Sequence, residues 1–147
     1  MINEMQDVLT AAFQSQMNNV YTAIPCVVVS IAGPSSVNIQ PSINQKMKDG
    51  GVKERPVIQS VPVSFPVSKT AGFTFPIKPG DTGIAVFSMR SLEAWKSSDG
   101  YPSTPPNYAK MDKNDAMFIP GIQTPGVAVN SPSKHVYDHS VEDAVMF

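Results

Sequence analysis

Two histidines near the C-terminal end of the sequence are the pair best suited to metal chemistry. His135 and His139 are four positions apart, which on a helix places both imidazoles on one face, as in some zinc enzymes. However, no Glu follows His135 directly, and no third ligand stands at a recognisable spacing. Asp138, Glu142 and Asp143 would extend such a site only in a favourable fold. We therefore predict no metal site and no cofactor, and keep a metal-dependent hydrolase built on the two histidines as an alternative.

A second candidate chemistry is the stacking of nucleobases on aromatic rings. Phe73 and Phe75 fall on one face of the segment if it is extended, and the polar stretch from Lys46 to Arg55 would supply a basic funnel. This pair of features describes a single-stranded nucleic-acid-binding module, the alternative to the main interpretation below. We favour packing of the two rings in a core or an interface, and a solvated loop for residues 44–55, with contact to an acidic partner as its alternative.

No pattern of a known catalytic type is present. The sequence contains no Gly-x-Ser-x-Gly elbow, no phosphate-cradling glycine loop and no acid/base dyad. Asp81 ends the turn Lys78–Asp81, in which Pro79 presets φ and Gly80 accepts positive φ, so turn formation explains the carboxylate. We predict that the protein is not an enzyme.

The composition favours a β-rich domain. The 147 residues are 41% hydrophobic with a net charge of −1, and fourteen prolines against nine glycines suit short strands joined by stiff loops. Only two arginines occur, which argues against a dedicated nucleic-acid binder. The single cysteine, Cys26, rules out an intrachain disulfide and predicts a small buried hydrophobe. No membrane-spanning segment is expected, because no apolar run approaches the roughly 20 residues that a bilayer requires. No classical export signal is expected, because Glu4 and Asp7 stand in the N-terminal segment.

The first 22 residues are expected to form the one substantial helix, from about Asn3 to Tyr21. Apolar residues recur there at three- and four-residue spacing and make a single stripe. The stripe either covers the chain's own barrel or docks on a neighbouring subunit. The residues predicted to form an interface, with the two phenylalanines above, are Val8, Leu9, Phe13, Met17, Phe73 and Phe75.

Five strands are expected between residues 23 and 122. The stretch Val61–Trp95 holds two of them around the Lys78–Asp81 turn, and its prolines Pro62 and Pro66 place the first at a sheet edge or a bulge. A single helical turn at residues 90–95 would let Leu92 and Trp95 cover a barrel end. The five predicted strands are Cys26–Ile31, Val37–Ile43, Pro56–Phe65, Thr82–Ser88 and Ala116–Ile119.

The order of these segments resembles a known family. The stretches IPCVVVSI, VNIQPSI, VPVSFP, FPIKPGD, the strand ending near Arg90 with Trp95 close behind, and DAMFIPG resemble the N-terminal barrel domain of the central-spike, or membrane-piercing, proteins of contractile-tailed phages. The similarity covers roughly Ala23 to Ile122. It implies a mainly β fold: a small five-stranded barrel of the oligonucleotide/oligosaccharide-binding (OB) type, with an N-terminal amphipathic helix (1–22) and an extended C-terminal tail or start of a spike tip (123–147).

The resemblance also implies partners and a location. The expected assembly is a homotrimer on the tail axis of the virion, attached to the baseplate hub and tail tube proteins and acting on the host envelope. In the family the barrel leads to an intertwined needle, sometimes with an iron ion held by histidines at its apex. Here some 25 residues follow the barrel, so we expect a short tip or a separate tip protein. The iron site is not carried over, because His135-Val136-Tyr137 lacks the second histidine of a His-x-His pair.

Overall fold

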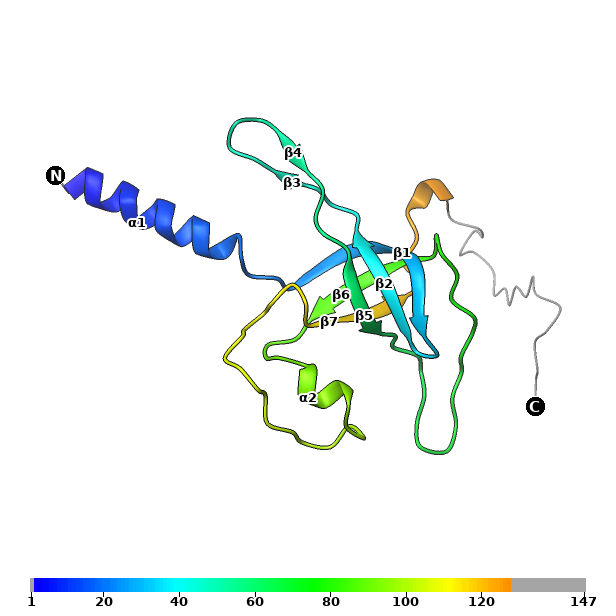
Figure 1. Ribbon diagram of the computed structural model, residues 1–147. Coiled ribbons are helices and arrows are strands. Elements are labelled where there is room, and N and C mark those ends of the chain that lie inside the picture. The colour runs from blue at the N-terminus through cyan, green and yellow to red at the C-terminus, as the bar shows by residue number, and fades with distance from the viewer. Residues whose placement is uncertain (1, 128–147) are drawn as a thin grey trace.

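The computed structural model describes residues 2–127, and these form a curled β-sheet with a helix standing away from it at the N-terminal end (Figure 1). Five antiparallel strands make the sheet, which curls into a half-barrel. Their order across the sheet is β5 (Ile58–Pro62), β2 (Ser36–Pro41), β1 (Ala23–Gly33), β6 (Thr82–Phe87) and β7 (Ala116–Pro120). All five strands expected from the sequence are therefore confirmed, in the expected chain order.

Alternation of side chains explains why these segments are strands. In β2 and β6 every second residue is buried and the residues between are half-buried, as expected for strands with a core on one face and partial cover on the other. The prediction for Pro62 is confirmed: β5 lies at a sheet edge, and its register against β2 shifts between Val37 and Ile39. The strand ends at Pro62 rather than Phe65.

The two edges of the sheet come together at Phe118. Just beyond the end of β5, Val63 forms a parallel bridge with Phe118 of β7, and the Ser64 N–H donates to the Phe118 carbonyl at 2.7 Å. The Phe118 side chain is fully buried. The curl of the sheet thus brings its first and last strands into contact along one short stretch.

One hydrophobic core fills the concave side of the sheet. Its members come from all five strands, so each strand is held by contacts with the others. Tyr21 and Ile77 pack against the rim of this core from outside the strands. The largest fully buried side chains are Phe118, Ile39, Val28, Val37, Val61 and Cys26, and the burial predicted for Cys26 is confirmed.

The turn before β6 has the expected form. Gly80 has φ of 98°, and Asp81 Oδ2 accepts a hydrogen bond from the Lys78 N–H at 2.8 Å. The turn is also tied to β1, because the Gly80 N–H donates to the Val28 carbonyl and the Val28 N–H to the Asp81 carbonyl, each at 2.8 Å. The hydrogen bond that stabilises this turn therefore explains the carboxylate at position 81.

The N-terminal helix is shorter than the sequence predicted. α1 spans Ile2–Met17, and Asn18 and Asn19 form a turn that ends it before Tyr21. The N–H groups of Asn19 and Val20 donate three residues back rather than four, which tightens the chain out of the helix. Asn side chains compete for backbone hydrogen bonds and favour such an ending.

Residues 44–55 are mostly exposed, as predicted for a solvated loop, but they are not a loop throughout. Two short strands, β3 (Gln45–Lys46) and β4 (Val52–Lys53), pair there as a ribbon that projects from the sheet (Figure 1). Gly50 supplies positive φ at its tip, and the Gly51 N–H donates to Asp49 Oδ1 at 2.8 Å. With two residue pairs, the ribbon is too short to show an alternating pattern in the sequence.

The remaining elements are small. α2 (Glu93–Lys96) forms the single helical turn predicted near Trp95, and Leu92 is buried as expected, whereas Trp95 is only partly covered. A 3-10 turn, η1 (Pro125–Val127), ends the described chain. Most of the predicted tail, including His135 and His139, lies outside the described residues. Among residues 2–127, no helix has the length and apolar character needed to cross a membrane.

A substitution at Gly83 tests the close approach of β6 and β7. A Cβ atom at Gly83 would stand 2.7 Å from the Phe118 ring and would also strike the Ile119 carbonyl. We expect Gly83→Ala to lower the free energy of unfolding by roughly 1–3 kcal/mol through overpacking. Gly126→Ala is the control, because nothing lies within 4 Å of its added methyl group. Equal denaturant midpoints for the two variants would contradict the packing argument.

The burial of Cys26 in the core can be tested by the pH dependence of the free energy of unfolding. Desolvation by burial raises the pKa of its thiol from 9.0 to about 12. Between these pH values the unfolded chain loses the thiol proton and the folded chain keeps it, so the free energy of unfolding falls as pH rises above 9. Urea unfolding at pH 8 and pH 10 should show a larger loss for the wild type than for Cys26→Ala, by about 1 kcal/mol. Identical losses would mean that the thiol is not desolvated.

Candidate interaction surfaces

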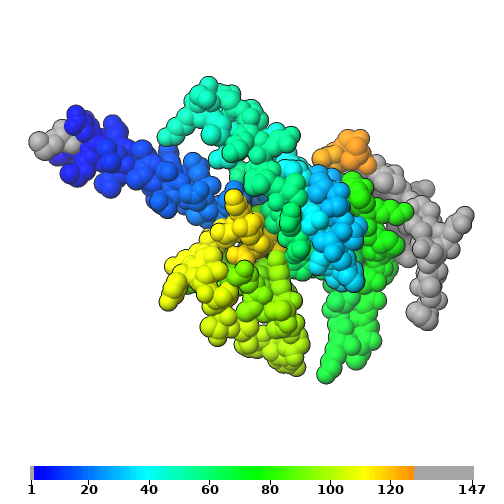
Figure 2. Space-filling model, in the orientation of Figure 1, coloured from blue at the N-terminus to red at the C-terminus, as the bar shows by residue number. Residues whose placement is uncertain are grey.

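The apolar stripe of α1 is uncovered in the described chain. No residue of α1 is buried, and Leu9 and Phe13 are 63% and 66% exposed. In Figure 2 the helix stands clear of the sheet along nearly its whole length. Of the two readings of the stripe, cover for the chain's own barrel is therefore wrong. The predicted interface residues Val8, Leu9, Phe13 and Met17 are all exposed, and docking on a neighbour stays a prediction.

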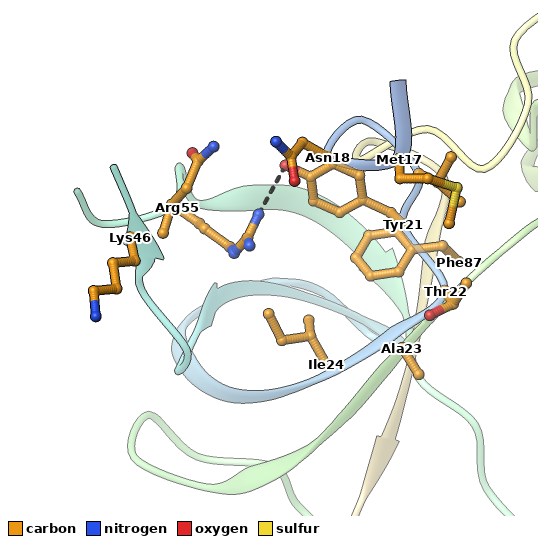
Figure 3. Close-up of a pocket in the computed structure, with 11 residues that line it drawn as sticks. Met17, Asn18, Tyr21, Thr22, Ala23, Ile24, Lys46, Arg55 and Phe87 are labelled. Atoms are coloured by element: carbon orange, nitrogen blue, oxygen red, sulfur yellow. Dashed lines mark hydrogen bonds between the residues drawn. The ribbon is translucent and has the colours of Figure 1, made fainter. Parts of the chain in front are cut away.

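The segment that joins α1 to the sheet is held by an aromatic and cationic cluster, drawn in Figure 3. Tyr21 packs edge-on against Phe87 with ring centroids 5.2 Å apart. The Arg55 guanidinium lies 5.5 Å from the centre of the Tyr21 ring, and its Nη1 donates to the Tyr21 hydroxyl at 3.2 Å. The Tyr21 N–H also donates to the Met111 carbonyl at 3.0 Å. Tyr21 is thus the point at which the linker is fastened to the sheet.

Arg55 fastens the β3–β4 ribbon to the same point. Its Nε donates to the Ile43 carbonyl at 3.1 Å, which ties together the two chain segments entering and leaving the ribbon. The Gln40 side chain of β2 donates to the Arg55 carbonyl. Through one side chain, the base of the ribbon and the start of β1 are held together.

An open recess of about 330 Å³ lies between the end of α1 and the ribbon base. Figure 3 shows its wall, with Arg55, Tyr21 and Phe87 side by side and Lys46 at the ribbon side. The polar groups around it are a phenol, a guanidinium, an ammonium, two side-chain amides and a hydroxyl, and the remaining side chains are apolar. The labelled residues include no carboxylate and no paired nucleophile and base.

The aromatic residues singled out in the sequence lie on a different part of the molecule. Phe75 packs edge-on against Phe65 at 5.2 Å between centroids, and Phe73 lies 6.0 Å from Phe75. Phe73 remains half exposed. Figure 1 places this loop, between β5 and β6, on the side of the sheet away from the β3–β4 ribbon. The structure therefore does not bring the two phenylalanines together with the Lys46–Arg55 stretch, as a nucleic-acid channel would need.

The cluster around Tyr21 was not found from the sequence. Tyr21 and Arg55 are 34 positions apart, and neither stands in a motif. The available signal was slight: an aromatic residue at the end of a helical stripe, and an arginine next to Pro56 at the end of a polar stretch. The interface role predicted for Phe73 and Phe75 is not tested by their positions, although both are partly exposed.

Comparison with known proteins identifies the class of protein to which this half-barrel belongs. A family model of a phage protein domain matches residues 24–121, which include every strand of the sheet except the first residue of β1. The chain belongs to the family of the phage protein Gp138 N-terminal domain. The match indicates a phage structural protein, a component of the virion. A comparison with curated proteins finds no match.

Arg55 provides a test of the cluster. Arg55→Ala removes its bonds to Tyr21 and Ile43, and we expect unfolding to become easier by about 1–2 kcal/mol, with faster amide exchange across the ribbon. Tyr21→Phe removes the hydroxyl alone. If the two groups act together, the double variant should be less destabilised than the two single effects combined.

Lys53→Ala is the control, because it shortens a cationic side chain of β4 that is exposed. Its unfolding midpoint should match that of the wild type within about 0.5 kcal/mol. Additive effects of Arg55→Ala and Tyr21→Phe would show that the two side chains do not couple.

Proposed function

We propose that the chain is the trimeric central spike at the tip of a contractile phage tail, attached to the baseplate hub and driven into the host envelope. Two things support it. The ordered segments of residues 23–122 resemble the barrel of central-spike proteins, and the family of phage domains matches nearly the same range, 24–121. The proposal assigns the chain a mechanical role and no catalytic activity.

The observation that carries the proposal is the contact between the sheet edges at Phe118. An OB barrel is a five-stranded, partly open barrel in which the curl of the sheet brings its outer strands together. The strand order β5-β2-β1-β6-β7, with the parallel bridge from Val63 to Phe118, fits such a barrel. We therefore extend the observed half-barrel to an OB-type barrel, which is the fold of the spike domain that the sequence resembles.

A spike domain has to transmit force without unfolding. When the sheath contracts, the load passes from the tube through the barrel to the tip. Here the strands are cross-linked by hydrogen bonds from edge to edge, and the core contains fully buried Phe118, Ile39 and Val61. Pro62 and Pro66 stiffen the segment that leads from β5 toward the turn before β6, and Pro79 stiffens the turn itself. Such a fold resists shear because many ladder bonds must break together.

The partners follow from the surfaces that the barrel leaves uncovered. α1, the ribbon and the aromatic loop all project or lie exposed, and they are the surfaces we assign to the hub, the tail tube and the other copies of the chain. The region after Val127 would lead toward the tip, or toward a separate tip protein. The role requires neither cofactor nor nucleic acid.

A single-stranded nucleic-acid-binding module is less well supported. It would need the phenylalanine loop and the basic stretch on one surface, and the two lie on different sides of the sheet (Figure 1). Salt-dependent binding of single-stranded nucleic acid would support this alternative function.

The assembly and its position test the proposal. Sedimentation of the full chain at micromolar concentration should give the mass of three 15.8 kDa chains. Averaged images of particles carrying a tag on this chain should show the added density on the tail axis, below the tube. A monomer in solution, or a tag on the sheath or capsid, would overturn the spike assignment.

A further inference from the structure

The apolar residues of α1 follow the seven-residue repeat of a helical bundle. Ile2, Met5, Leu9 and Ala12 are spaced by three, four and three residues, the spacing of the inward positions of a coiled coil. Gln16 occupies the next inward position. The residues at the three outward positions of the repeat are polar, apart from Ala11 and Met17. The repeat keeps one seam of the helix facing a partner over its whole length.

The stripe is wider than a two-stranded seam requires. Val8 and Phe13 flank the inward positions on opposite sides, and they are 67% and 66% exposed. In a helix packed between two others, these flanking positions also become buried, whereas in a two-stranded coil they stay near water. The width therefore favours a bundle of more than two helices.

The inward and flanking positions of the repeat expose apolar side chains along the helix. Ile2, Met5, Val8, Leu9 and Phe13 are each more than 60% exposed. A helix of this kind gains most of its stability by burying its apolar face against a partner. An isolated helix of 16 residues is also only marginally stable in water. The helix thus needs a partner that covers the whole stripe.

The charges of α1 select among the possible partners. Glu4 and Asp7 are its only charged side chains, and both fall at outward positions of the repeat. Parallel copies of the helix would therefore keep these carboxylates apart and in water. A membrane surface is disfavoured, because an interfacial helix carries Lys or Arg on its polar face and α1 has neither. Docking of the stripe on the β3–β4 ribbon is also disfavoured, because Asp7 would then face away from the lysines of the ribbon.

We propose that the α1 helices of the three copies pack against one another as a parallel, left-handed three-helix bundle on the tail axis. The inference rests on the homotrimer of the proposed function and specifies the surface that the copies share. Because each helix leaves its barrel at the same point, the three run in the same direction. Tyr21, fastened by Arg55 and Met111, sets where each helix departs from its sheet.

Gln16 gives the bundle a defined register. It stands at the inward position nearest the barrels, and three copies would meet on the axis and bond to one another through their amides. A polar residue at one inward position fixes register and number of strands at some cost in stability. The other inward layers, from Ile2 to Ala12, are apolar.

Cysteine cross-linking of the full chain tests the bundle. Ala12→Cys places a thiol on the axis, and Gln14→Cys places one on the outward face. After mild oxidation with copper phenanthroline we expect at least tenfold more covalent dimer for Ala12→Cys than for Gln14→Cys. The native Cys26 adds little background, because it is buried and burial raises the pKa of its thiol to about 12.

A charge placed in the seam gives a second, independent measurement. Leu9→Glu should raise the concentration at which the oligomer dissociates at least tenfold, since it brings three carboxylates together in an apolar layer. Gln14→Glu adds the same charge on the outward face and should leave that concentration unchanged. Far-ultraviolet circular dichroism and the melting temperature of the barrel confirm that each variant is folded.

The outcomes separate this inference from the proposed function. A trimer in which Ala12→Cys does not cross-link and Leu9→Glu has no effect would overturn the bundle and leave the spike assignment standing. Loss of hub binding in Leu9→Glu, with assembly intact, would assign the stripe to the hub and also overturn the bundle. Cross-linking in a chain whose native mass is a dimer would support packing of α1 on itself and overturn the trimer. A monomer would overturn both.

Discussion

The structure depends on the contact that Phe118 makes with both halves of the sheet. Its ring lies where a side chain at position 83 would stand, and its carbonyl accepts the Ser64 N–H that follows β5. A twisted five-stranded sheet left open would expose two unpaired edges, which are sites of aggregation. Gly83 permits the close approach of β6 and β7, and that approach positions Phe118 to meet Val63. The absence of a side chain at Gly83 thus leaves room for the ring that the twisted sheet brings to this edge contact.

Most of the sheet was predictable because its strands alternate or form short apolar runs between turn residues. In Val37 to Pro41 burial follows the predicted alternation, and Thr82 to Phe87, apolar on both faces, is a strand with one face buried and the other half-buried. The edge contact was not predictable, since it depends on the summed twist of five strands and not on any local pattern. The β3–β4 ribbon was missed because two residue pairs carry too little alternation. The helix end was misplaced because Val20 continued the apolar stripe beyond the turn at Asn18 and Asn19.

The candidate surfaces also differ in how far the sequence alone predicts them. The stripe of α1 is a local, periodic property, and the sequence predicted it with its interface residues. Whether the stripe is covered is a tertiary property, and only the structure shows that residues 2–127 do not cover it. The cluster of Tyr21 and Arg55 joins residues 34 positions apart through a hydrogen bond and a cation–π contact. A single sequence holds no signal that links such a pair.

The curl of the sheet also limits how copies of this chain can associate. Where β5 and β7 meet at Phe118, their backbone groups bond to each other and are not free to pair with another chain. The described core is filled by the chain's own side chains. The projecting helix α1 carries an apolar stripe, and both of its charged residues stand at outward positions. Because the two edges of the half-barrel bond to each other at Phe118, the assembly proposed above places contact between copies on α1 rather than on those edges.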